Sequence, residues 1–566
     1  MTTADLLAAL RTGANGSSRP ALADQHAPSG GVLSAACFAL LAAWLGLALW
    51  RSHLQFDDAY MFYRYALNLR DGLGIAWNPD GVQTYGLTSH LWLLAVLPFT
   101  VLPLEPGVAL QVASTLAAAA AITTLGLTVA RHATSDALSD RSLAIAVVGL
   151  PLVLNPAFVP NVTNGMDTMA SLLAHACIVL AVLGYARTPT QHNAVVVGLV
   201  AFAAVLTRPE NGLCALGVPL LMFMQMGARR RWSHLLGLTV LPALLIALEL
   251  VVCAWVFGAP LPLSFYAKAL HAYANFQNPE NPVRYLLLGV FCALPFIAVL
   301  LVVAPRRLLG WLAAFLLPVA ATAMYLLTVR QVMGMSGRYF VPFLPYVIVP
   351  ATLMLDGALA ATTDRRSLVR RVGSVFAGLL VAAAVTSPVQ AVVCDAYMRL
   401  VLPTDVAMPS LPIRSAEPVP QLDWFDVMVR LVDDVVRPLP AQAVVAASEV
   451  GYLGVAAPKV SVIDLVGLND TAIGTRGFSM DDLLGRQPDL IWFPHHDYTG
   501  LRARMFADQR LYQRYLVLPD AFNYGIAIRR DGPFRALIEH NAGVAWSRLY
   551  PGEEMARHVA ERGPSR

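Results

Sequence analysis

Apolar stretches of membrane-spanning length recur from residue 31 to residue 393 of this chain. The first, Gly31–Trp50, contains no charged residue, and a helix needs about 20 apolar residues to cross a bilayer. With this anchor we count about eleven spans. The others are expected at 107–130, 142–160, 168–186, 194–206, 211–227, 235–257, 285–304, 308–329, 339–355 and 372–393. The run 89–104 is interrupted by Pro98 and Pro103, and we interpret it as a half-helix or re-entrant segment.

Composition supports the same class. Only 13% of the residues are charged, whereas soluble globular proteins carry about 25%, and the mean hydropathy is +0.59.

The net charge of +4 is small, which argues against nucleic acid as a partner. The six cysteines form neither a disulfide framework nor a C-x-x-C metal motif. We expect no cofactor, and a divalent metal ion stays open, although nothing in the sequence indicates or requires one.

Arginine-rich loops predict the orientation of the spans, because short cytoplasmic loops are enriched in Lys and Arg. Arg229–Arg231, Arg306–Arg307 and Arg365–Arg371 mark the cytoplasmic side. Counting from them places 258–284, 330–338 and everything after 393 on the outer side, together with Asn164–Thr168 and Thr207–Glu210. The loop that begins near Asp57 joins these segments only if 89–104 does not fully cross.

We therefore expect three parts. Residues 1–30 form a disordered polar tail, 31–393 a membrane domain with a first outer loop at 51–88, and 394–566 an outer α/β domain. Short β-like runs in the last part alternate with helical stretches, which is typical of a small α/β fold. These runs are Val444–Ala447, Val460–Asp464, Asp489–Phe493, Tyr515–Leu518 and Gly525–Ile528.

Unusual polar residues gather in the loops that this topology places outside. They are Asp57 and Asp58, Asp167, Arg208 and Glu210, Lys268, and Arg338. Cations at a membrane interface suit the phosphate of a lipid-linked substrate, and a nearby carboxylate suits a base for an incoming hydroxyl. The simpler interpretations remain open: Asp57 and Asp58 as a helix cap, Lys268 and Arg338 as interfacial anchors, and Arg208 with Glu210 as a local ion pair.

Several strings resemble one known group of enzymes. They are Asp57-Asp58-Ala59-Tyr60, Arg64-Tyr65-Ala66, Trp77-Asn78-Pro79, Tyr85-Gly86-Leu87-Thr88-Ser89, Pro262-Leu263-Ser264-Phe265-Tyr266-Ala267-Lys268, Gly337-Arg338-Tyr339-Phe340-Val341-Pro342 and Ile463-Asp464-Leu465-Val466-Gly467-Leu468-Asn469-Asp470. Over most of residues 32–530 the chain resembles bacterial GT-C glycosyltransferases, in particular the arabinofuranosyltransferase B family. It departs from the relatives at Gly165-Met166-Asp167-Thr168, where they often read Gly-Leu-Glu-Thr.

The resemblance implies a polytopic GT-C membrane enzyme that takes a sugar, D-arabinofuranose in the closest family, from a polyprenyl-phosphate donor to a cell-envelope glycan. It implies that one of the two acidic residues of the first loop, Asp57 or Asp58, is the catalytic residue. On this interpretation the donor phosphate is bound by Lys268, Arg338 and Arg208, and the remaining substrate contacts come from Tyr60, Arg64, Asp167, Glu210 and Tyr266. The enzyme would lie in the bacterial inner membrane with its active site on the periplasmic face.

Two other functions stay open. A transferase of the same fold could move mannose or another hexose onto a glycan, lipid or protein such as pilin. A transporter for a lipid-linked glycan is the non-enzyme alternative, although its expected broken helices and midplane charges are not evident. The sequence His495-His496-Asp497 invites a metal interpretation. Adjacent histidines do not share a helix face, so we expect a loop there.

Overall fold

The computed structural model describes residues 46, 56–155, 157–227, 231–270, 282–304, 308–328, 334–385, 424–519, 521–552 and 555. The expected tail 1–30 and most of the expected first anchor lie outside these residues. The chain divides into two compact units, each built from separated segments. The first comprises the described parts of Met1–Leu54, Gln111–Glu249 and Glu280–Leu402, and the second those of Gln55–Leu110, Leu250–Pro279 and Pro403–Arg566.

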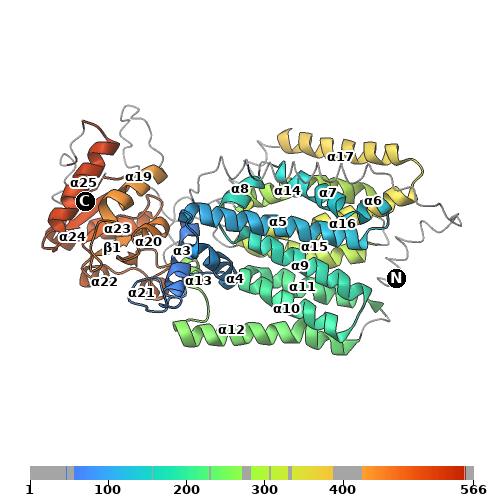
Figure 1. The fold of residues 1–566 in the computed structure, drawn as a ribbon, viewed down its shortest axis with the longest axis horizontal. Helices are drawn as coiled ribbons and strands as arrows, with labels where there is room; N and C mark the ends of the chain where they lie inside the picture. Colours follow the sequence, from blue (N-terminus) through green and yellow to red (C-terminus); the bar gives the residue numbers. More distant parts are fainter. Residues whose placement is uncertain are drawn as a thin grey trace. The chain divides into compact units, whose positions relative to one another are not determined.

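The first unit is helical, and Figure 1 shows its long helices running in similar directions. Its elements are α5 (Pro106–His132), which begins in the second unit, α6 (Asp136–Ser139), α7 (Arg141–Val153), α8 (Val159–Thr163), α9 (Thr168–Arg187), α10 (Gln191–Thr207), η2 (Pro209–Asn211), α11 (Gly212–Met224), η4 (Trp232–His234), η5 (Leu236–Val240), α12 (Leu241–Phe257), which ends in the second unit, α14 (Pro282–Val303), α15 (Leu309–Thr328), η7 (Met335–Gly337), η8 (Val341–Phe343), α16 (Pro345–Ala361) and α17 (Arg365–Val385).

Local sequence explains where these helices begin and how closely they pack. The Asp140 carboxylate caps α7 by accepting from the backbone N–H of Leu143, and the Thr190 hydroxyl caps α10. Gly198 lets α10 approach η5, because a Cβ there would overlap the carbonyl oxygen of Gly237. Small residues at helix contacts are typical of membrane bundles.

Within the described residues, seven helices are long and apolar enough to span a membrane. The prediction of a helical membrane protein is confirmed at this level. The expected spans at 142–160, 194–206 and 211–227 correspond to shorter helices, and the first of them breaks between Val153 and Val159. The run 89–104 contains only twelve helical residues, His90–Val101, about 18 Å of helix, which is too short to cross a bilayer core of about 30 Å.

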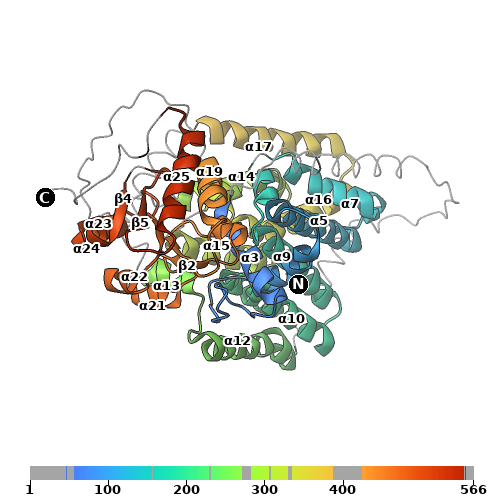
Figure 2. The same cartoon turned by 60° about the vertical axis from the view of Figure 1, so that its left-hand side comes forward.

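The second unit joins the segment 56–110 to the C-terminal α/β region. Figure 2 shows strands β4 and β5 with α25 beside them. Its elements are α3 (Asp57–Arg70), α4 (His90–Val96), η1 (Leu97–Val101), α13 (Leu263–Leu270), α19 (Trp424–Leu431), η9 (Val432–Val436), β1 (Val444–Ala447), α20 (Gly451–Ala456), β2 (Ser461–Asp464), α21 (Thr471–Arg476), α22 (Met480–Gly485), β3 (Leu490–Trp492), α23 (Thr499–Ala507), α24 (Gln509–Arg514), β4 (Tyr515–Leu518), β5 (Ile526–Arg529) and α25 (Arg535–Leu549).

The described strands form one five-stranded sheet in the order β2-β1-β3-β5-β4. Strand β1 is parallel to both β2 and β3, with Val445 opposite Val462 and Leu490, while β5 pairs antiparallel with β3 and β4. All five expected β-like runs are strands, within one residue of the expected bounds. The prediction of a C-terminal α/β fold is therefore confirmed.

Candidate functional site

The first polar cluster begins at Asp57, the first residue of α3. Its two carboxylate oxygens accept hydrogen bonds from the backbone N–H groups of Gly451 (2.8 Å) and Tyr452 (2.7 Å) at the start of α20. The side chain is only 3% exposed. A glycine is required at 451, because a Cβ would overlap the carbonyl oxygen of Asp57. Thus a carboxylate of the first loop is bonded directly to the C-terminal α/β fold, 394 residues further along the chain.

A second carboxyl group, Glu449, belongs to the same cluster. It follows β1 and is partly buried, and the Ser448 hydroxyl donates to its Oε1 (3.1 Å). Burial raises the pKa of Glu449 to about 8, and the negative charges of Asp57 and Asp58 add to the shift. Burial also raises the pKa of Asp57 to about 6, against the lowering effect of its two N–H donors. Crowded carboxyl groups of this kind retain a proton near neutral pH.

Sequence analysis missed Glu449. Its surroundings, Ala446-Ala447-Ser448-Glu449-Val450, contain no recognisable motif. The usable signal was its position directly after a predicted strand, where ligand-binding residues of α/β folds concentrate.

Histidine and aromatic side chains lie beside Glu449. The His495 backbone N–H donates to Ser448 Oγ (3.2 Å), which links the loops after β1 and β3. The His495 ring contacts Tyr524 (4.9 Å between centroids), which stacks on Trp492 (5.4 Å). The neighbouring His496 bonds instead to the carbonyl oxygen of Asn523 (2.9 Å). Both imidazole rings contact Tyr524. The two histidines lie between β3 and α23, outside any helix or strand, so the expected loop is confirmed.

Two further motif residues hold α3 against the C-terminal fold. The Tyr65 hydroxyl donates to Asn469 Oδ1 (3.0 Å), and Asn469 donates to Asp464, whose carboxylate also accepts the N–H groups of Val466 and Gly467. Burial raises the pKa of Asp464 to about 7. The segment Asp464–Asn469 therefore forms a hydrogen-bonded turn that contacts α3 through Tyr65.

Two predicted substrate contacts, Arg64 and Tyr60, are buried in the second unit. Arg64 is 1% exposed and donates to the carbonyl oxygens of Trp77 (2.9 Å) and Pro458 (2.7 Å), so a substrate contact would require these bonds to break. Tyr60 is buried with its ring against Tyr452 (5.4 Å).

Helix α13 brings the remaining second-unit residues to the α/β fold, since it packs on α21. It carries Tyr266, which is partly buried, and Lys268, whose side chain lies outside what the structure describes. The backbone N–H of Leu263 at its start bonds to the carbonyl oxygen of Tyr85 (2.8 Å).

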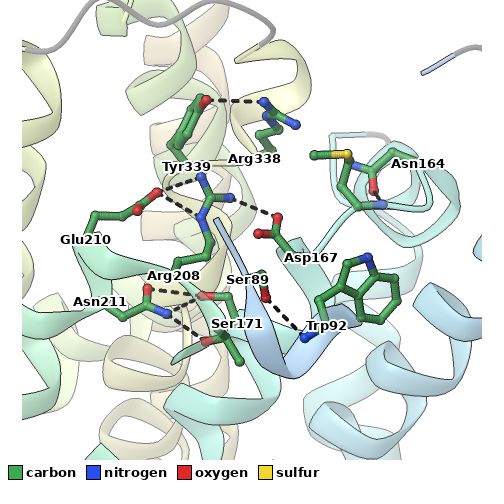
Figure 3. Close-up of polar contacts among 12 residues, drawn as sticks. Ser89, Trp92, Asn164, Asp167, Ser171, Arg208, Glu210, Asn211, Arg338 and Tyr339 are labelled. Carbon is green, nitrogen blue, oxygen red and sulfur yellow. Dashed lines mark hydrogen bonds and ion pairs between the residues drawn. The ribbon is translucent and has the colours of Figure 1, made fainter. Parts of the chain in front are cut away.

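A separate cluster in the first unit surrounds Arg208 (Figure 3). Its guanidinium pairs with Glu210 (2.6 Å) and Asp167 (3.4 Å) and stacks on the ring of Tyr339 (4.6 Å to the centroid). Arg338 is also buried, with its Nη2 bonded to the Tyr339 hydroxyl (3.2 Å). Burial raises the pKa of Asp167, and the charges of Arg208 and Arg338 oppose this shift. Four predicted site residues from three separate loops are thus brought together.

A buried hydrogen-bond network supports the chain at Arg208. Asn211 donates to the carbonyl oxygen of Ala204 (2.8 Å) and to Thr207 Oγ1 (3.0 Å), which fixes the turn between α10 and η2. The Asn211 oxygen faces His175 Nε2 (3.0 Å), and His175 Nδ1 faces the Tyr346 hydroxyl (2.7 Å). Because the asparagine oxygen can only accept, Nε2 is the donor and Nδ1 accepts from Tyr346.

The structure therefore assigns the predicted residues to two groups. Asp57, Asp58, Tyr60, Arg64, Tyr266 and the helix that carries Lys268 belong to the second unit, and Asp167, Arg208, Glu210 and Arg338 to the first. Comparison with known proteins gives no match to a family model, a curated protein or a solved structure.

Proposed function

We propose that the chain is a membrane glycosyltransferase. In this proposal it moves a sugar, D-arabinofuranose in the first instance, from a polyprenyl-phosphate donor to a cell-envelope glycan at the outer face of the bacterial inner membrane. The observation that carries the proposal is the bonding of Asp57 to the start of α20. It joins the acidic first loop of a membrane protein to an α/β fold that holds a further carboxyl group.

The segments that make up the second unit support a location of the first loop, Lys268 and the α/β fold on one side of the membrane. This unit unites the first loop, the segment 250–279 and the C-terminal region, the three segments in which Asp57, Lys268 and the α/β fold were expected on the outer side. A hydrogen bond between Asp57 and α20 requires that the first loop and the α/β fold share a membrane face.

The geometry supports different roles for Asp57 and Asp58. Both oxygens of Asp57 accept backbone N–H groups, so this residue holds the loop in place. We assign the chemical step to Asp58, which is partly buried and adjoins it. Its carboxylate would take the proton of the acceptor hydroxyl while that oxygen bonds to the anomeric carbon; the bond from the anomeric carbon to the phosphate oxygen breaks and polyprenyl phosphate leaves.

Lys268, in the same unit as Asp58, would bind the departing phosphate. Arg208 already pairs with two carboxylates and lies with Arg338 in the first unit, so we assign these two arginines to holding the cluster around Tyr339. Polyprenyl phosphate is a leaving group of low basicity, so this scheme does not require a metal ion.

The test uses the full chain purified into lipid nanodiscs. It is supplied separately with polyprenyl-phosphate arabinofuranose and polyprenyl-phosphate mannose, and release of polyprenyl phosphate and the glycosylated product are measured. We expect Asp58→Asn to reduce kcat by about 10²–10⁴-fold, the usual contribution of a general base. The matched control is Asp80→Asn, an exposed carboxylate of the same loop, which should leave the rate unchanged.

The outcomes separate the alternatives. Transfer from the mannose donor alone would move the assignment to a hexosyltransferase of the same type. Full activity of Asp58→Asn would refute the assigned base. Movement of either lipid across the membrane without sugar transfer would replace the enzyme with a transporter.

A further inference from the structure

The parallel strands of the second unit create a topological switch point. From β1 the chain passes through α20 to β2 on one side, and later returns to β3 on the other side of β1. The loops that leave the carboxyl ends of β1 and β3 therefore lead in opposite directions. In open α/β sheets, ligands bind at this position, outside the carboxyl ends of the strands.

The residues at this switch point can hydrogen-bond a polyhydroxyl ligand. Ser448 and Glu449 follow β1, and His495 follows β3 with its side chain 36% exposed. The His495 backbone N–H donates to Ser448 Oγ, and the Ser448 hydroxyl donates to Glu449. The Tyr524 ring packs against His495 from the start of β5. These are neutral or protonatable donors and acceptors of the kind that sugar hydroxyl groups match.

The same residues adjoin the first-loop acids. Glu449 is two positions before Gly451, whose N–H holds Asp57, and the charges of Asp57 and Asp58 act on its carboxyl group. The pKa of Glu449, about 8, leaves the group protonated at neutral pH. It can then donate one hydrogen bond and accept another without adding a third negative charge.

We infer that Glu449 is an acceptor-binding residue: its carboxyl group hydrogen-bonds a hydroxyl of a carbohydrate acceptor at the switch point, next to the hydroxyl on which Asp58 acts. The inference rests on the proposed function and gives the α/β fold a direct part in choosing the acceptor.

The experiment uses the full chain in nanodiscs and two probes, octyl arabinofuranoside and octyl mannopyranoside. Loss of one hydrogen bond predicts that Glu449→Ala raises the acceptor KM about tenfold, with donor KM and kcat unchanged. Glu449→Gln should rescue the KM, because an amide also donates and accepts. The wild type should lose acceptor affinity above about pH 8 and the Gln variant should not. Glu539→Gln, a carboxylate on α25 paired with Arg535, is the matched control.

Probe binding is measured separately by saturation-transfer NMR without donor. Binding that depends on Glu449, with no sugar transfer by the wild type, would support this site and refute the proposed function. Transfer with an unchanged acceptor KM in Glu449→Ala would refute this inference alone. Equal losses in the Ala and Gln variants, or no binding of either probe to the wild type, would also overturn it.

Discussion

The substitution Gly451→Ala adds one methyl group at the start of α20 and should move α20 away from α3. A Cβ on Gly451 would overlap the carbonyl oxygen of Asp57, and it would lie 2.7 Å from the carbonyl carbon and 3.0 Å from Cγ. The overlapping atoms are backbone atoms of α3, so a side-chain rotation cannot relieve the clash. The start of α20 must move away from α3 in Gly451→Ala.

That movement breaks both hydrogen bonds to the Asp57 carboxylate. Each hydrogen bond to a charged group contributes about 1.5–3 kcal/mol, so together they stabilise the contact by about 3–6 kcal/mol. Amide protection at the start of α20 should fall by roughly 10²–10⁴-fold, since each 1.4 kcal/mol is a factor of ten. Hydrogen–deuterium exchange of a peptide covering residues 448–456 measures this directly in the full chain.

Two controls make the result specific. Gly485→Ala, at the end of α22, adds the same methyl group where no atom lies within 4 Å, and it should leave exchange at α20 unchanged. Asp57→Ala should destabilise the wild type but add little to Gly451→Ala, because the two residues share one interaction. Equal amide protection of α20 in Gly451→Ala and Gly485→Ala would refute the predicted clash. So would additive effects of Asp57→Ala and Gly451→Ala on that protection.

Three further results are expected. Arg208→Gln leaves the buried carboxylate of Asp167 and the partly buried one of Glu210 without Arg208, so thermal unfolding should show a loss of about 3–5 kcal/mol, and a loss below about 1 kcal/mol would contradict the ion-pair geometry. Tyr346→Phe removes the donor to His175 Nδ1 and should cost about 1 kcal/mol in the same assay, whereas a stabilised variant would argue against this hydrogen bond. Because the folded-state pKa values of Asp57 and Glu449 are raised to about 6 and about 8, their ionisation opposes folding. The melting temperature should therefore fall as pH rises from about 5 to about 8.5, less steeply in Glu449→Gln, and a rise would refute the assignment.

The strands of the C-terminal region could be predicted because their sequence pattern is local. Val444–Ala447 and Tyr515–Leu518 are short apolar runs that contain β-forming Val and Tyr residues, and both are strands with the predicted bounds. Apolar length predicted most of the long helices, but α17 begins at Arg365, seven residues before the predicted 372, and includes arginines that were expected in a loop. It overestimated continuity at 142–160, where the helix ends at Val153, because hydropathy does not report whether successive peptide groups remain hydrogen-bonded as one helix.

The composition of the sites was only partly predictable. Arg208, Glu210 and Asp167 stood out in the sequence because charged residues are costly near hydrocarbon, and they do meet. Glu449 did not stand out, because in a polar domain one glutamate is unremarkable. Glu449 matters because its carboxyl group lies within the electrostatic influence of Asp57. That proximity results from the packing of segments far apart in the chain, which cannot be predicted from residue spacing.

The packing also explains why two adjacent acids at one helix start can have different tasks. Successive residues of an α-helix point about 100° apart, so a first residue that faces its partner directs the second elsewhere. Asp57 faces α20, and its bonds to Gly451 and Tyr452 fix the rotation of α3 about its axis. The direction of Asp58 is thereby set by a contact that Asp58 does not make. A substitution at Asp57 should accordingly act on structure first and on rate through structure, whereas one at Asp58 should act on rate while amide protection at α20 stays intact.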